Sequence, residues 1–263
     1  MFFTHIAWLL EGLKRSLTTY TRLPIPIVWC TEKQSAQPAA FLPLVGILVA
    51  FLSAWPIFVP AFDVSLTALF MLLTAVLLTG AFHEDGFMDA TDGLVGGMNP
   101  EQRLTIMKDS RLGSYAAIGI WFLLALKWLL LSKLLTLSDN AYAIVVCWLA
   151  THILARVTPL LIMHRLPYVS LGNSKAAPMI GRFKRVEWLI VILPVFALIG
   201  AFHAIGLVWY NIAFLIGGVC FTALCLGYYC YRKIAGFNGD TLGASEQCSE
   251  VLMLFLIVLF FSF

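Results

Sequence analysis

Residues 64–93 read VSLTALFMLLTAVLLTGAFHEDGFMDATDG, an apolar stretch that runs directly into a cluster of acids. The stretch from Val64 to Phe82 carries no charge and is nearly long enough to cross a ~30 Å hydrocarbon core as a helix. Asp85, Asp89 and Asp92 follow at the spacing i, i+4, i+7, which places their carboxylates within an arc of roughly 60° on one helical face. The pattern predicts a membrane helix that leads into three neighbouring carboxylates.

The whole chain has the composition of a membrane protein. Of its 263 residues, 61% are hydrophobic and 12% are charged, whereas a soluble domain is about half apolar and a quarter charged. Apolar residues fill the long stretches without alternation, which favours helices over a membrane barrel. We therefore expect an all-α polytopic transmembrane helical bundle of about seven spans, forming one integral membrane catalytic domain over residues 1–263. The expected spans are Phe41–Phe62, Val64–Phe82, Gly113–Leu135, Ala141–Met163, Trp188–Leu207, Val208–Tyr231 and Cys248–Phe263.

The N-terminal segment is apolar but does not resemble a cleavable signal. In Met1–Leu13 the apolar run precedes the basic pair Lys14 and Arg15, which is the reverse of the signal-peptide order. We expect an amphipathic helix lying at the membrane surface. A short buried packing helix is an equally good interpretation.

Basic residues are distributed unevenly between the two sides of the predicted bundle. Fourteen of the seventeen Lys and Arg residues fall in the N-terminal 40 residues or in the loops after the second, fourth and sixth spans. The positive-inside rule places these segments in the cytoplasm, together with the acidic cluster. Polar groups therefore crowd one surface, which favours an enzyme with a cytoplasmic site over a transporter with vestibules on both sides.

The acidic cluster is the first candidate site. Three like charges on one face repel one another, and a hard divalent cation such as Mg²⁺ would hold them together. Asp85, Asp89 and Asp92 are the expected ligands, and Glu84, to the side of that face, is a further candidate. The alternative is a solvated loop at the end of the span, which Gly86 and its neighbouring glycines would also allow.

A cationic segment follows the acids. Asn99 and Pro100 have the sequence signature of a helix start, and a short surface helix is expected to run to Arg111. Lys and Arg beside a metal-bound carboxylate suit a diphosphate, which needs both kinds of charge. An ordinary positive-inside loop is the alternative. The polar candidates in this segment are Arg103, Lys108, Asp109 and Arg111.

Three more polar residues are candidate substrate contacts. Arg156 lies inside the fourth predicted span, where a phosphate or carboxylate partner, or a structural salt bridge to one of the Asp residues, would explain it. Asp240 lies among glycines in GFNGDTLGA (236–244), which suggests a tight turn with close backbone approach, although a plain turn before the last helix would look similar. Arg22 precedes two prolines that mark a bend, and it could reach a phosphate.

Other chemistries lack support in the sequence. We find no nucleophilic triad, phosphate-binding P-loop, dinucleotide fingerprint or zinc motif, and the six cysteines form no Cys-x-x-Cys pair. No nucleic-acid partner is expected, and oligomer formation is left open.

Several motifs in this order resemble the cobalamin synthase family, also called adenosylcobinamide-GDP ribazoletransferase. The match runs along nearly the whole chain, and the one departure is Glu84, where an apolar residue is expected. The motifs are His83-x-Asp85-Gly86-x-x-Asp89-x-x-Asp92-Gly93, Ile106-Met107-Lys108-Asp109-Ser110-Arg111-Leu112-Gly113, Gly239-Asp240-Thr241-Leu242-Gly243-Ala244, Arg22-Leu23-Pro24, Phe41-x-Pro43-Leu44-Val45-Gly46 and Arg165-Leu166-Pro167-Tyr168.

The resemblance implies a reaction. Adenosylcobinamide-GDP and α-ribazole, or its 5′-phosphate, would give adenosylcobalamin, or its 5′-phosphate, and GMP, with Mg²⁺ in the bacterial inner membrane. From the residues, we expect Mg²⁺ on the three Asp residues to grip the diphosphate, Asp92 to accept a proton, and Lys108 and Arg111 to hold the leaving charge. A Mg²⁺-dependent membrane prenyltransferase and a cation or solute transporter are the alternatives.

Overall fold

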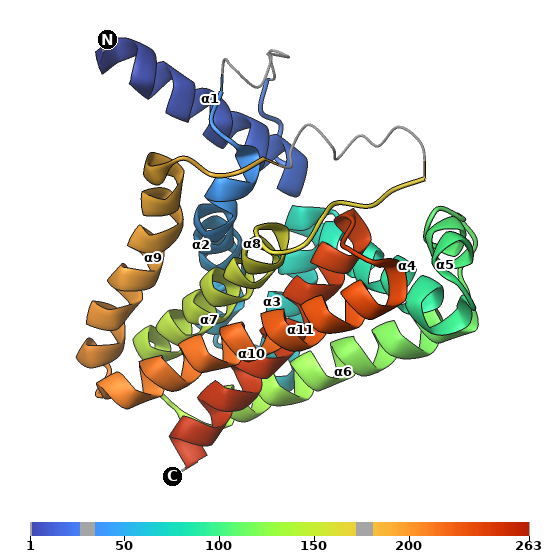
Figure 1. Ribbon diagram of the computed structural model, residues 1–263. Coiled ribbons are helices and arrows are strands. Elements are labelled where there is room, and N and C mark those ends of the chain that lie inside the picture. The colour runs from blue at the N-terminus through green and yellow to red at the C-terminus, as the bar shows by residue number, and fades with distance from the viewer. Residues whose placement is uncertain (1, 27–34, 172–180, 263) are drawn as a thin grey trace.

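The computed structural model describes residues 2–26, 35–171 and 181–262, with side chains from residue 6 onward. Helices dominate this part of the chain, and Figure 1 shows them gathered into one bundle with the two chain ends at opposite sides. The expected all-α bundle is confirmed. The helices are α1 Phe2–Tyr20, α2 Leu42–Ser53, α3 Val64–Thr79, α4 Phe82–Gly96, α5 Pro100–Met107, α6 Ser114–Leu137, α7 Ala141–Ala155, α8 Val157–Met163, α9 Arg185–Ala204, α10 Trp209–Ile234 and α11 Gly239–Ser262, with short 3-10 turns at Pro38–Phe41 and Trp55–Phe58.

The predicted spans are largely confirmed. Among the described residues, six helical segments are long and apolar enough to cross a membrane, and a bent pair of helices makes a seventh when it is counted as one span. The fourth predicted span is the pair α7 and α8, which together cover Ala141–Met163. The fifth and sixth predicted spans are separate helices because the chain turns between them at Gly206, where φ is +81°.

The second and last predicted spans differ from the prediction. The second span stops at Thr79, because Gly80 and Ala81 both adopt left-handed backbone conformations, and α4 leaves α3 at an angle of 87°. The last helix begins at Gly239, nine residues before the predicted start at Cys248. Those early residues are polar but mostly buried, so the helix extends through a stretch that hydropathy alone excludes.

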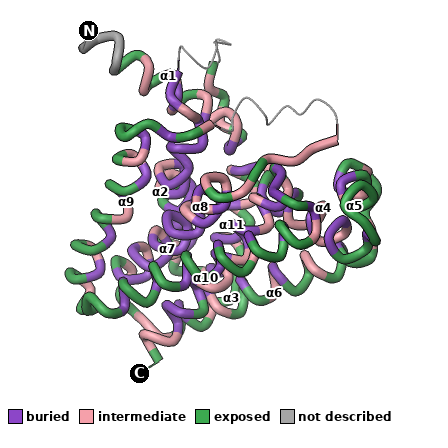
Figure 2. Tube along the Cα trace, viewed as in Figure 1, coloured by how far each residue is buried: buried purple, intermediate pink, exposed green. Residues whose placement is uncertain are grey.

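The bundle has a buried centre and an apolar outer surface. In an apolar stretch of 18 residues, 78% of the α7–α8 segment is buried, against 22% of α6 and 28% of α9 in stretches of the same length. Figure 2 shows the same contrast along the chain. Exposed side chains on the outer helices are large and apolar, such as Trp121, Leu193 and Phe221. Such an exposed apolar surface is typical of a multi-pass protein in contact with lipid.

The N-terminal helix α1 forms as predicted and lies across one end of the bundle (Figure 1). One side of it, including Trp8, Leu13 and Leu17, packs against the core, while Ile6 and Leu10 are exposed. The helix therefore combines features of both interpretations, because it packs on the protein and also presents an apolar edge outward.

Candidate active site

The acidic cluster lies on the helix α4, so the alternative of a solvated loop is wrong. Asp85 is exposed, and Asp89 and Asp92 are half-buried. The charges of Asp85 and Asp92 act on Asp89, so the three carboxylates do share one region of the helix. The sequence spacing predicted this arrangement correctly.

Asp240 joins this cluster from the other end of the chain. The charges of Asp89 and Asp85 both act on Asp240, which lies in the first turn of α11. The two helices approach closely, because a Cβ atom on Gly86 would lie 3.2 Å from the Asp240 Cα atom, and one on Gly243 would lie 3.1 Å from the His83 carbonyl oxygen. The glycines thus bring two backbones together, as small residues do between membrane helices. The predicted close approach is confirmed, but it occurs in a helix rather than in a turn.

Asn238 orients Asp240. Asn238 precedes α11, and its side-chain oxygen accepts the Thr241 N–H at 2.9 Å, in the manner of an N-cap. The Asn238 amide also donates to Asp240 Oδ2 at 3.1 Å. The charge of Lys108 acts on Asp240 as well, and the Lys108 ammonium donates to the Leu171 carbonyl oxygen. Asp85, Asp89, Asp240 and Lys108 therefore form the acidic site with one cation beside it.

Asp92 has a different environment from the one its spacing suggested. Its carboxylate accepts the Gly113 N–H at 2.7 Å and the Ala116 N–H at 2.8 Å, at the start of α6. A Cβ atom on Gly113 would lie 2.5 Å from the carboxylate oxygens, so only glycine permits this contact. Both oxygens thus cap a helix N-terminus. The structure thus gives Asp92 a capping role, and its expected role as base and metal ligand stays a prediction.

In the cationic segment, Arg103 binds the backbone. Arg103 donates to three backbone carbonyl oxygens, those of Gly97, Met98 and Lys233, at 3.0, 3.1 and 2.7 Å. The guanidinium of Arg103 thereby ties α5 to the end of α10, and its expected role as a substrate contact stays a prediction.

Arg111 and Asp109 form an exposed local ion pair at 2.5 Å after α5. Hydrogen bonds from Arg111 lower the pKa of the Asp109 carboxyl to about 2. Neither side chain contacts an acid of α4 in the hydrogen bonds and ion pairs of the described residues.

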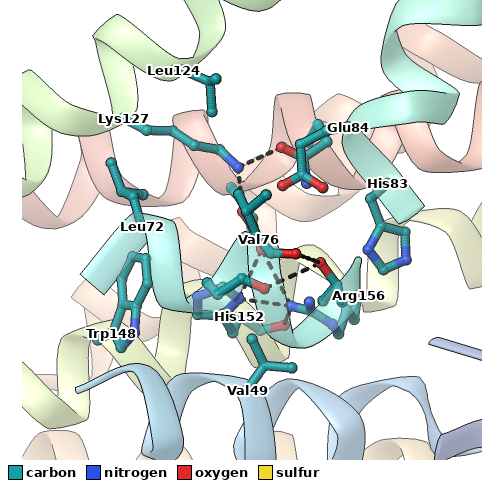
Figure 3. A pocket seen from close by; sticks show the side chains of 14 residues that line it. Val49, Leu72, Val76, His83, Glu84, Leu124, Lys127, Trp148, His152 and Arg156 are labelled. Atoms are coloured by element: carbon teal, nitrogen blue, oxygen red, sulfur yellow. Dashed lines mark hydrogen bonds and ion pairs between the residues drawn. The ribbon is translucent and has the colours of Figure 1, made fainter. Parts of the chain in front are cut away.

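Arg156 and Glu84 belong to a second, internal cluster. Figure 3 shows Lys127, His83, Glu84, His152 and Arg156 around a small cavity of about 10 Å³. Arg156 is 1% exposed and lies 3.1 Å from Glu246 and 3.2 Å from Glu250, both on α11. The structure therefore gives Arg156 a carboxylate partner, from Glu residues rather than the expected Asp or a phosphate. Glu84 is also buried and lies apart from the exposed Asp85.

The internal cluster is held together mainly by Glu250. Its carboxylate lies 2.5 Å from the Lys127 ammonium and 2.8 Å from the His152 ring, in addition to Arg156. Lys127 also donates to the Gln247 side chain. Sequence reasoning assigned no role to Glu246 or Glu250, although their spacing of four residues in a largely apolar helix is a signal of a shared buried face.

Arg22 lies over the corner between α3 and α4. Its backbone N–H donates to the Leu78 carbonyl oxygen at 2.7 Å, and its side chain crosses Gly80, where a Cβ atom would lie 2.0 Å from Nε. The residue is exposed. Arg22 is therefore near the start of the acidic helix, as a phosphate contact would require.

The acidic site has the donor chemistry of a magnesium site. Its donors are carboxylate oxygens, which a hard cation prefers. In the described ranges, no three His, Cys, Asp or Glu side chains form a ready-made metal cluster. Mg²⁺ commonly binds through one or two carboxylates and completes its coordination with water and substrate phosphates, so the residues fit such an ion.

Comparison with known proteins identifies the family. The family model described as cobalamin-5-phosphate synthase matches residues 12–258, a range that includes all of the acidic site. This chain belongs to the cobalamin-5-phosphate synthase family. The family match thus extends from α1 to α11, across every helix that contributes to either polar cluster.

Curated relatives agree with the family assignment. The chain is 34% identical to an adenosylcobinamide-GDP ribazoletransferase of Ralstonia pickettii, with 93% of each chain covered. It is 32% identical to the protein of that name from Shewanella piezotolerans, covering 91% of this chain and 92% of the relative. A Vibrio cholerae relative of the same name is 31% identical, with 95% of this chain and 94% of the relative covered. No solved structure matches the chain significantly.

Proposed function

We propose that this enzyme transfers the phospho-adenosylcobinamide part of adenosylcobinamide-GDP to α-ribazole or α-ribazole 5′-phosphate. The reaction releases GMP and forms adenosylcobalamin or its 5′-phosphate. The enzyme works in the bacterial inner membrane, with its active site facing the cytoplasm, where the basic loops gather. Family membership supports the reaction class, and the names of the relatives support the substrates.

The observation that carries the proposal is the close approach of α4 and α11, where a Cβ atom on Gly86 would lie 3.2 Å from the Asp240 Cα atom. This approach brings Asp240 within range of the charges of Asp85, Asp89 and Lys108. Repelling carboxylates brought together by two helices need a cation between them, and a diphosphate needs a cation to bind. Magnesium bound by these carboxylates supplies charge neutralisation for the diphosphate and for its transition state.

The residues of the chain then have distinct tasks in the transfer. Asp85 and Asp240 hold the metal-binding position, and Asp89, half-buried between like charges, accepts the proton of the attacking ribazole hydroxyl. The hydroxyl oxygen bonds to the phosphorus attached to the cobinamide arm, and the bond from that phosphorus to the GMP oxygen breaks. Lys108, and Arg111 once it leaves Asp109, counter the charge on the departing GMP.

The test is GMP release by purified protein in lipid nanodiscs. We expect release only when adenosylcobinamide-GDP, α-ribazole and Mg²⁺ are all present. Asp89→Asn is expected to lower the rate at least ~100-fold with unchanged expression, since general acid–base catalysis contributes about 10²–10⁴-fold. Absence of GMP from the complete wild-type mixture would refute the proposal.

The same preparation separates the alternatives. A prenyltransferase would release inorganic diphosphate from a prenyl diphosphate and would not need a corrinoid. A transporter would move solute across proteoliposomes without producing GMP. The internal cluster offers no open path for a solute, because its cavity measures about 10 Å³ and its lining residues Lys127 and Arg156 are 2% and 1% exposed.

A further inference from the structure

A second cavity lies near the acidic site; it shares His83 with the internal cavity and is otherwise built from different residues. It measures about 80 Å³ and lies between α1, α4, α8 and α11. The side chains that matter for its chemistry are Thr19, Tyr20, Phe82, His83, Met163 and Leu242. Its walls are mostly hydrocarbon or aromatic ring, so it offers few partners to a polar ligand.

The cavity and the acids share two helices. Phe82 lines the cavity and lies three residues before Asp85, so both occupy the same side of α4. Gly239 also lines the cavity and directly precedes Asp240 in α11. A ligand seated in the cavity would therefore present its outer end to the carboxylates.

Three rings form one wall of the cavity. The rings of Phe82 and His83 meet edge to face at 5.3 Å, and Tyr20 lies nearly parallel to His83 at 6.1 Å. Tyr20 also meets Phe82 edge to face at 5.4 Å. Aromatic groups prefer these arrangements with centroids 4.5–7 Å apart, so the wall suits another flat ring.

The chemistry of the reactants selects one occupant. This step rests on the proposed function. A corrinoid is far larger than this cavity, whose volume of about 80 Å³ admits only one edge of a smaller flat ring system. The polar edges of guanine would lose their hydrogen bonds against hydrocarbon walls, at a cost of about 1–3 kcal/mol per unpaired group. The dimethylated benzimidazole ring of α-ribazole is flat, uncharged and largely apolar, and it carries its ribose at one side.

We propose that this cavity between α1, α4, α8 and α11 receives the methylated edge of the aromatic base of the nucleoside acceptor. The base stacks on the wall of Tyr20, Phe82 and His83, and the ribose extends toward Asp85 and Asp240. The N-terminal helix α1 then forms part of the substrate site in addition to packing on the bundle.

Two adjacent threonines on α1 provide a matched pair of variants. Thr18 and Thr19 are both half-buried, and each hydroxyl donates to the carbonyl oxygen four residues earlier, at 2.8 and 2.7 Å. Only Thr19 lines the cavity. Thr19→Phe should fill the cavity, and Thr18→Phe should leave it open.

The first experiment measures binding of free 5,6-dimethylbenzimidazole by calorimetry in nanodiscs, without Mg²⁺ or the corrinoid substrate. We expect saturable binding to the wild type, at least ~10-fold weaker binding to Thr19→Phe, and an affinity within about 2-fold for Thr18→Phe, since a pocket mismatch of a methylene or more is worth about 10-fold. Equal affinities for wild type and Thr19→Phe, or no saturable binding to the wild type, would overturn the proposal.

A second variant tests the assignment by changing base size. Leu242→Ala enlarges the cavity and should raise the ratio of kcat/KM for a naphthimidazole nucleoside over the benzimidazole nucleoside by about 10-fold. Damage to the fold would lower both kcat/KM values together, so a raised ratio cannot come from damage. An unchanged ratio counts against the pocket. Base binding without GMP release would refute the reaction alone. GMP release with Thr19→Phe matching the wild type in acceptor KM would refute the base pocket alone.

Discussion

Removal of the Glu250 carboxylate should destabilise the protein more than any change at its surface. Glu250 contacts Lys127, His152 and Arg156 at 2.5, 2.8 and 3.2 Å, inside the apolar bundle. In Glu250→Leu, Arg156 keeps Glu246, but Lys127 keeps only the uncharged Gln247. The substitution therefore leaves a buried ammonium without a direct ion-pair partner, although the charges of Glu84 and Glu246 still act on it.

The magnitude follows from that uncompensated charge. Breaking a buried ion pair by removing one partner costs about 3–5 kcal/mol, and the three contacts do not add because one carboxylate makes all of them. Removing both charges costs less, since apolar replacements of a buried pair are often neutral. We expect the free energy of unfolding of the double variant Lys127→Met/Glu250→Leu to exceed that of Glu250→Leu alone by at least ~2 kcal/mol.

The assay is reversible unfolding in mixed micelles, followed by the loss of helical circular dichroism. Lys14→Met is the control, because Lys14 and Glu11 form a partly exposed pair at 3.7 Å that should contribute no more than about 1 kcal/mol. The reasoning is refuted if the free energy of unfolding of Glu250→Leu lies within about 1 kcal/mol of the wild-type value. A double variant less stable than Glu250→Leu would contradict it as well.

Three further predictions concern the acidic site and its supports. Gly86→Val should force α4 away from α11 and abolish GMP release, whereas Gly96→Val, with only the ring of Tyr115 at 3.6 Å, should keep at least half of the wild-type rate in the same assay. Asp92→Ala should lower the free energy of unfolding by about 1–2 kcal/mol through loss of the cap on α6, and an unchanged denaturation midpoint would contradict that role. Arg103→Met should lower stability by about 2 kcal/mol while leaving the KM of the corrinoid substrate unchanged, and a raised KM with normal stability would restore Arg103 as a substrate contact.

The membrane helices could be predicted from sequence because one physical quantity decides them. A run of about 20 apolar residues crosses the hydrocarbon core, and the chain contains such runs with few interruptions. The bend between α3 and α4 could not be predicted in the same way. Gly80 is a common helix terminator, but Ala81 is a strong helix former and yet has φ of +58°. Beyond this bend α4 packs closely on α11, a tertiary contact that the local sequence does not report.

The acidic site was only partly predictable for a related reason. The spacing of Asp85, Asp89 and Asp92 fixes a helical face, but it does not fix what lies opposite each carboxylate. The structure places α11 near Asp85 and Asp89, and the start of α6 at Asp92. Positions on one face of a helix therefore have unequal environments, since each turn of α4 meets a different neighbour.

The internal cluster and the acidic site are connected through α11. That helix carries Asp240 in its first turn and Glu246 and Glu250 deeper in the bundle, where they pair with Arg156 and Lys127. A helix among apolar neighbours can slide or rotate at little cost, because one apolar contact resembles the next, whereas buried charges are satisfied in only one register. We therefore expect the ion pairs to set the depth and rotation of α11, and through them the position of Asp240 against Asp85. On this reasoning the polar residues within the bundle position the carboxylates at its end.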